Sequence, residues 1–203
     1  MSNPSVAWRR LQAGNHQFHS TPRLAQNVAT SGHTPAAVVF RCADADAASE
    51  VVFGQREGSL VEISNWGHVI DTGVLATAEY AVEKLKTPLI VVLGHHQCAA
   101  MQTTLDAWAN VRIPHGAVRA VVEQAISSLA RPDSDIGSPE ELAAAHVVQS
   151  GVSLLQKSPA LTKAVDHGDS AIVCLVSDAD GRIRVCATFG NVADSTPRPL
   201  EYV

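Results

Sequence analysis

Short apolar runs alternate along the chain with longer segments in which apolar residues recur every three or four positions. The short runs are typical of strands, and the three-to-four spacing is typical of helices that bury one face. The predicted strands are residues 36–40, 59–63, 89–93, 171–176 and 183–187. The predicted helices are residues 6–18, 47–53 (a short helical turn), 72–85, 99–109, 116–129 and 140–155, with polar loops at 21–34 and 131–139.

This alternation predicts an α/β fold with a mainly parallel central sheet, flanked by helices and preceded by a long N-terminal helix. The run at 89–93 is apolar at every position, which is typical of a parallel strand buried on both faces. Residues 178–181 (Asp-Ala-Asp-Gly) separate the last two apolar runs and indicate a hairpin, hence an antiparallel edge strand. We expect residues 1–203 to form a single domain.

The composition agrees with one compact domain, because 203 residues that are 46% hydrophobic and 17% charged can bury a substantial core. A formal net charge of −5 argues against nucleic acid or an anionic membrane as a partner. No apolar run approaches the roughly 18 residues of a membrane span, and no signal-peptide core follows the first residues. Four cysteines in this length favour a reducing compartment, so we expect a cytoplasmic protein.

Side chains that bind metals follow two of the predicted strands. Cys42 and Asp44 come after the run at 36–40, and His95 and Cys98 come after the run at 89–93. Parallel strands place their carboxyl ends at one edge of the sheet, where α/β proteins have their sites. Two thiolates, an imidazole and a nearby carboxylate suit Zn²⁺. The sequence therefore predicts a zinc site at this edge.

Several residues near this pattern have other interpretations. Asp44 could cap a helix that starts near Ala45, and His68 is equally consistent with a turn residue or a site residue. Cys174 and Cys186 are interpreted as small buried hydrophobes. The remaining histidines are expected to be structural or solvated and unconnected to the cysteines: His16, His19, His33, His115, His146 and His167.

The segments R-C-A-D-A-D from Arg41 and G-H-H-Q-C-A-A from Gly94 resemble the β-class carbonic anhydrases, which carry Cys-x-Asp-x-Arg and Gly-His-x-x-Cys-Gly. The resemblance continues at residues 8–18, 67–85 and 170–185, so it covers nearly the whole chain. It implies a zinc lyase that hydrates carbon dioxide reversibly through zinc-bound hydroxide. It also implies that Cys42, His95 and Cys98 are the zinc ligands, and that the protein is a homodimer or a dimer of dimers.

The chain departs from the family pattern around the expected metal. Asp46 stands where the family has arginine, and Trp66 precedes Gly67 in a segment (64–67) where many members have Arg-x-Ala-Gly. His96 and Gln97 fill the variable pair, and Ala99 replaces a glycine. We expect these six residues to line the substrate pocket: Asp46, Trp66, Gly67, His96, Gln97 and Ala99.

The resemblance gives Asp44 two roles. Held by the family's arginine, this aspartate accepts a hydrogen bond from zinc-bound water. Released, it becomes a fourth zinc ligand and closes the site. Asp46 cannot form that salt bridge, and Arg41 on its strand should point to the face opposite Cys42. We therefore expect weakened or altered activity; an arginine from elsewhere, such as a partner subunit, could instead take that place, and activity would then be ordinary. The alternatives are a zinc hydrolase, lyase or hydratase acting on another small electrophile, and an inactive zinc-binding homologue.

Overall fold

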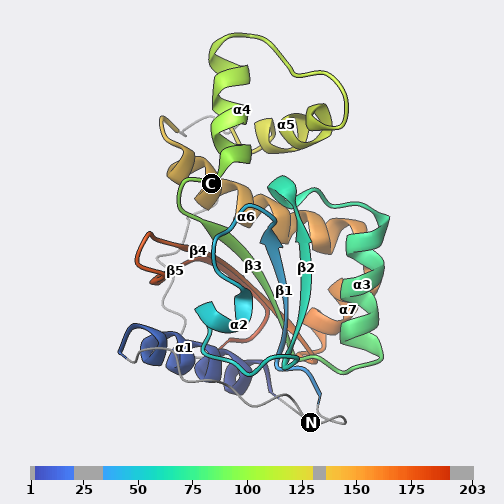
Figure 1. Ribbon diagram of the computed structural model, residues 1–203. Coiled ribbons are helices and arrows are strands. Elements are labelled where there is room, and N and C mark those ends of the chain that lie inside the picture. The colour runs from blue at the N-terminus through green and yellow to red at the C-terminus, as the bar shows by residue number, and fades with distance from the viewer. Residues whose placement is uncertain (1–2, 21–33, 130–135, 193–203) are drawn as a thin grey trace.

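The computed structural model describes residues 3–20, 34–129 and 136–192. Within these residues one mixed sheet has the strand order β2-β1-β3-β4-β5 (Figure 1). The strands are β1 (Ala37–Cys42), β2 (Leu60–Asn65), β3 (Leu89–His95), β4 (Ala171–Ser177) and β5 (Ile183–Phe189). The first four strands run parallel, and β5 pairs antiparallel with β4. The predicted fold class is confirmed, including the antiparallel edge.

The predicted helical segments are all helical, with shifted ends. The helices are α1 (Pro4–Ser20), α2 (Ser49–Val52), α3 (Thr72–Glu83), α4 (Ala99–Ala109), α5 (Val118–Ile126), α6 (Pro139–Lys157) and α7 (Pro159–Asp166), with a 3₁₀ turn η1 (Trp66–His68). Two elements, α7 and η1, have no counterpart in the sequence prediction. The predicted loop at 21–34 lies almost wholly outside the described residues, as does most of the loop at 131–139.

The sheet lies between two helical layers (Figure 1). On one face α1 and α2 pack against the sheet, and Trp8 and Leu11 of α1 are completely buried there. On the other face α3, α6 and α7 cover a second apolar cluster that includes Phe40, Ile90 and Ile172. Helices α4 and α5 project beyond the carboxyl ends of the strands, at the top of Figure 1. No helix among the described residues is both long and apolar enough to cross a membrane.

Strand β1 occupies the position that organises the site. Its six residues are all buried, because helices cover both faces of the sheet. Side chains alternate between the faces: Val39 packs in the cluster beneath α1 and α2, and Phe40 packs in the opposite cluster. Arg41 therefore points to the α1–α2 face and Cys42 to the other, as predicted. Because β1 pairs directly with β3, the residues that follow the two strands emerge side by side.

Candidate metal centre

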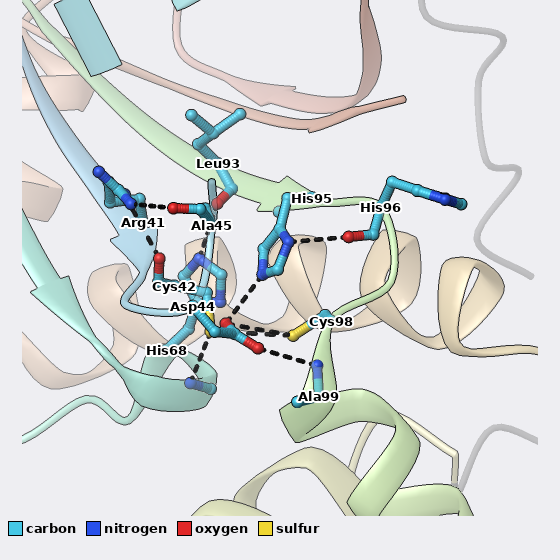
Figure 2. Close-up of polar contacts among 12 residues, drawn as sticks. Arg41, Cys42, Asp44, Ala45, His68, Leu93, His95, His96, Cys98 and Ala99 are labelled. Atoms are coloured by element: carbon cyan, nitrogen blue, oxygen red, sulfur yellow. Dashed lines mark hydrogen bonds and ion pairs between the residues drawn. The ribbon is translucent and has the colours of Figure 1, made fainter. Parts of the chain in front are cut away.

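Four side chains converge where β1 and β3 end (Figure 2). The ligand atoms of Cys42, Asp44, His95 and Cys98 all lie within 4.8 Å of one another. The two sulfur atoms are 3.8 Å apart, and Oδ1 of Asp44 is 2.9 Å from Nε2 of His95. The structure thus brings together the residues that the sequence singled out. Their soft and borderline donors fit Zn²⁺, and its binding here stays a prediction.

The ring of His95 is oriented by its own loop. Its Nδ1 lies 2.9 Å from the carbonyl oxygen of His96, a contact that requires the proton on Nδ1. Nε2 then faces Asp44 and the sulfur atoms: in the protonated ring it donates to Oδ1 of Asp44, and on losing that proton it can bind a metal. The His95 side chain is only 10% exposed. Burial alone would lower its pKa, but contacts with Cys42 and the Asp44 carboxylate outweigh burial and raise the pKa of His95.

The carboxylate of Asp44 is held from two sides. Oδ2 accepts a hydrogen bond from the backbone N–H of Ala99 at 2.8 Å, in the first turn of α4, while Oδ1 faces His95 and Cys98. Burial opposes ionisation, but hydrogen bonds to Cys42 and Ala99 and the charge of His95 lower the pKa of Asp44. The interpretation of Asp44 as a cap for a helix near Ala45 is wrong, because α2 begins at Ser49 after Ala48. Asp44 instead contacts the N-terminus of α4.

The two thiols have different proton affinities. Proximity to Cys98 and burial raise the pKa of Cys42. The hydrogen bond with Cys42 lowers the pKa of Cys98 despite burial, and the backbone N–H groups of Met101 and Ala100 in α4 add to this effect. The N-terminus of α4 therefore favours the thiolate form of Cys98. A metal that binds both sulfur atoms must displace the remaining proton from Cys42.

The 3₁₀ turn η1, which follows β2, contacts Cys42. The backbone N–H of Gly67 donates to Sγ of Cys42 at 3.0 Å. Gly67 has a φ of 74°, and a Cβ at this position would lie 2.3 Å from Cγ1 of Val121. Only glycine fits both the left-handed backbone and this close approach. Trp66, immediately before it, is half-buried and packs against the cluster that contains Cys42, Cys98 and Val121.

Two buried histidines complete this turn. Nε2 of His68 donates to the carbonyl of Leu93 at 3.0 Å, and Nε2 of His146 in α6 donates to the carbonyl of Gly67 at 3.0 Å. Burial lowers the pKa of His68 to about 3 and that of His146 to about 4, so both rings are neutral. Nδ1 of His146 faces Oγ of Ser128 at 3.0 Å. The space between these rings, His95 and Cys98 is too narrow for a water molecule.

The role of His68 and His146 differs from expectation in one respect. Both are structural, but the prediction that His146 is unconnected to the cysteines is wrong, because it holds the residue whose N–H binds Cys42. Its acceptor is a backbone carbonyl 79 residues away, which leaves no signal in the sequence. Cys174 is completely buried, as predicted, whereas Cys186 is only partly buried.

The other predicted pocket residues flank the ligands in the sequence and are exposed or partly buried. Asp46, Gln97 and Ala99 are exposed. Nδ1 of His96 is 3.3 Å from Oε1 of Glu140 at the start of α6, and 36% of the His96 side chain is exposed. Gln97 adopts a φ of 52°, which lets the chain turn between His95 and Cys98. Contact of these residues with a substrate stays a prediction.

Comparison with known proteins places this geometry in context. A family model described as carbonic anhydrase matches residues 37–183. The chain is 36% identical over 202 residues to a carbonic anhydrase of Mycolicibacterium smegmatis, covering 95% of this chain and 98% of that protein. It is also 36% identical over 203 residues to carbonic anhydrase 2 of Mycobacterium tuberculosis, with the same coverage.

Solved structures show the same fold. A Coccomyxa β-carbonic anhydrase in complex with acetazolamide aligns with a TM-score of 0.66 at 18% identity, over 76% of this chain and 73% of that chain. The β-carbonic anhydrase CcaA aligns with a TM-score of 0.65 at 20% identity, over 80% of both chains. One of two tetrameric β-carbonic anhydrases from Sordaria macrospora aligns with a TM-score of 0.63 at 21% identity, over 76% of this chain and 81% of that chain.

Proposed function

This chain belongs to the β-class carbonic anhydrase family, and from that premise we propose that it is a zinc lyase with a site that Asp44 closes in the resting state. The observation that carries the proposal is the position of the Asp44 carboxylate, 2.9 Å from Nε2 of His95 and within 4.8 Å of every other ligand atom. Reversible hydration of carbon dioxide is the proposed reaction, and we expect it to be weak in the native protein.

Cys42, His95 and Cys98 are proposed to hold the zinc ion. An open coordination position on zinc supplies a water molecule whose pKa is lowered to about 7, and hence a nucleophile for carbon dioxide at neutral pH. Contacts within the chain bring two of these ligands toward the form that binds a metal. The carbonyl of His96 fixes the His95 tautomer, and the backbone N–H groups of α4 favour the Cys98 thiolate. Zinc is the cofactor that these donors suit best.

Asp44 decides whether the fourth position is open. In the family pattern an arginine two residues later holds this carboxylate away from the metal, and here that position carries the exposed Asp46. In the described part of the chain the carboxylate contacts His95, Cys98 and Ala99. Because Ala99 binds one oxygen, the other is directed at the ligand cluster. An open site therefore requires Asp44 to rotate away, breaking its contact with His95.

The proposed small-molecule substrate is carbon dioxide or bicarbonate, and we expect its pocket to be lined by the exposed residues Asp46, Gln97 and Ala99, the partly buried His96 and Trp66, and the buried Gly67. The working unit is proposed to be a homodimer or a dimer of dimers in the cytoplasm. The two β-carbonic anhydrases of Sordaria macrospora, which are described as tetrameric, support that proposal.

One observation favours a second function. Trp66 places a large half-buried aromatic ring against the cluster that includes both cysteines, where many family members have a smaller residue. A changed pocket would suit another small electrophile in a hydrolase, lyase or hydratase reaction of the same zinc site. Permanent closure by Asp44 would instead give an inactive zinc-binding homologue.

Stopped-flow hydration of carbon dioxide by zinc-loaded protein tests the proposal. We expect low native turnover and a rise of about tenfold or more in kcat/KM for Asp46→Arg, the range typical of groups that orient metal ligands. Glu57→Arg, the same charge change at an exposed turn, is the control and should leave the rate unchanged. High native turnover that Asp46→Arg does not improve would contradict closure by Asp44. No turnover in either protein would favour one of the two alternatives.

A further inference from the structure

Arg41, the residue before Cys42, has a buried charge that the proposed reaction does not use. It is 9% exposed and lies on the α1–α2 face of the sheet, away from the ligand cluster. Its guanidinium donates from Nη2 to the carbonyl of Ala45 at 2.6 Å and from Nε to the carbonyl of Cys42 at 3.3 Å (Figure 2). A buried arginine must use its donors in this way, because an unpaired buried charge is strongly destabilising.

Glu62 of β2 completes this arrangement. Its Oε1 is 3.5 Å from Nη1 of Arg41, and its Oε2 accepts hydrogen bonds from Oγ and N of Ser49 at 2.5 and 3.3 Å. Ser49 is the first residue of α2. The network therefore connects β1, β2 and α2. Its contacts lie at both ends of the loop that carries Asp44, at Cys42 and at Ser49.

Asp44 lies between the two carbonyls that Arg41 binds. Fixing the carbonyls of Cys42 and Ala45 fixes the backbone on both sides of Asp44, and the peptide planes then direct its carboxylate toward Ala99 and His95. In the family pattern the arginine follows the aspartate and competes with the metal for its carboxylate. In this chain the arginine precedes the cysteine and binds only the backbone of this loop, so the carboxylate stays available to the metal.

We propose that Arg41 and Glu62 are positioning residues that hold the loop of residues 42–45 so that Asp44 closes the metal site. This inference rests on the proposed zinc site, and it identifies the residues that keep Asp44 in the closed position. Without the two carbonyl contacts the loop would move, Asp44 would leave the cluster, and the fourth coordination position would open to solvent and anions.

Binding of azide to the cobalt-substituted protein tests the proposal without measuring activity. Co²⁺ replaces Zn²⁺ in such sites and has a visible spectrum that changes when an anion enters an open position. We expect the native protein to take up one Co²⁺ per chain and to bind azide weakly. Arg41→Met should bind azide about tenfold more tightly, an effect of the size that outer partners of metal ligands have on a metal site.

Three further variants separate positioning from general stability. Arg41→Lys keeps the charge and reaches only one carbonyl, so its azide affinity should fall between those of the native protein and Arg41→Met. Glu62→Gln should shift the affinity in the same direction as Arg41→Met. Arg119→Met removes an exposed arginine that pairs with Glu123 on α5 and should leave azide binding unchanged.

The outcomes are distinguishable. Native azide affinity in a folded Arg41→Met would overturn the positioning role, and if that variant does not fold, native affinity in both Arg41→Lys and Glu62→Gln would overturn it. Failure of the native protein to take up Co²⁺ would overturn the proposed metal site itself. Tight azide binding by native protein would show that Asp44 does not close the site, and the inference would fail with it.

Discussion

The two loops that supply the proposed metal ligands are held in different ways. The loop after β3 is supported locally: His95 binds the carbonyl of the next residue, and Cys98 is the N-cap of α4. The loop after β1 has one neighbouring support, Arg41, which binds the carbonyls of Cys42 and Ala45, and is otherwise held by distant elements, because Cys42 contacts Gly67 and Asp44 contacts Ala99. The first loop needs little beyond its own residues. The second depends on contacts with Gly67 and Ala99 from other elements as well.

Cys98→Ser removes a proposed ligand from the locally supported loop and should have the largest effect. The serine hydroxyl is a poor ligand for zinc compared with a thiolate, so we expect retained zinc to fall below about a tenth of the native amount. Elemental analysis of purified protein measures this. Cys186→Ser, a partly buried cysteine of β5 outside the cluster, is the control and should keep its zinc. Undiminished zinc in Cys98→Ser would contradict the ligand assignment.

Gly67→Ala tests the outside support of the other loop. A Cβ at this position meets Val121 at 2.3 Å, and alanine is also strained at a φ of 74°. Gly116→Ala is the matched control, since Gly116 has a φ of 70° and a Cβ added there would have no atom within 4 Å. We expect both to lose about 1 kcal/mol from backbone strain, and Gly67→Ala to lose about 1–3 kcal/mol more. Urea unfolding gives both values. Equal losses of stability would mean that Val121 can move aside for the added methyl group at no energetic cost.

His146 supports the proposed metal site indirectly, through Gly67, and the pH dependence of unfolding isolates its contribution to stability. Its pKa is about 4 in the folded protein against 6.5 for an exposed histidine, so the unfolded chain binds more protons below pH 6.5. The stability from this group is therefore present above pH 6.5 and is lost as pH falls toward 4. From pH 7 to pH 5 the native protein should lose about 2 kcal/mol more than His146→Gln, whose amide can still donate to Gly67.

That comparison uses metal-free protein in chelator, so that ligand protonation does not contribute. Urea unfolding at the two pH values gives the difference directly. An identical pH dependence in native protein and His146→Gln would show that the ring does not stay neutral in the folded state.

Trp66 contacts the cluster that both loops share, and its replacement should have the smallest effect on stability. The ring is half-buried, so Trp66→Ala should cost about 2 kcal/mol or less. If Trp66 forms the pocket wall, kcat/KM for carbon dioxide should change several-fold at the same time. Trp108→Ala, at a tryptophan 55% exposed on α4, is the control. A large loss of stability with unchanged kinetics would identify Trp66 as packing alone.

The sequence predicts the ligand cluster because each of its parts has a local signal. Apolar runs mark β1 and β3, and the ligand types follow each run within a few residues. The parallel arrangement then places Cys42 beside Cys98 without further information. The same argument predicts that Arg41 points away from Cys42, because side chains alternate along a strand.

The supports of the cluster could not be predicted in this way. Ala99 and Gly67 contribute backbone N–H groups, which every residue except proline possesses, so no residue type signals them. Helix α7 escapes prediction because Ser158 both ends α6 and caps α7, leaving no loop between them. The partners of Arg41 are two carbonyls and one carboxylate from β2, and that combination exists only once β1 and β2 pair.

The strand order also sets when a nascent chain can assemble the proposed metal site. Cys42 and Cys98 are 56 residues apart, and β2 and α3 lie between them in the sequence. The β1–β3 pairing that joins them is a long-range contact, which forms late and slowly compared with local structure. Metal uptake should then follow the folding of the sheet rather than guide it. The rate at which refolding protein takes up Co²⁺, followed by its visible spectrum, would then report the rate at which β1 and β3 pair.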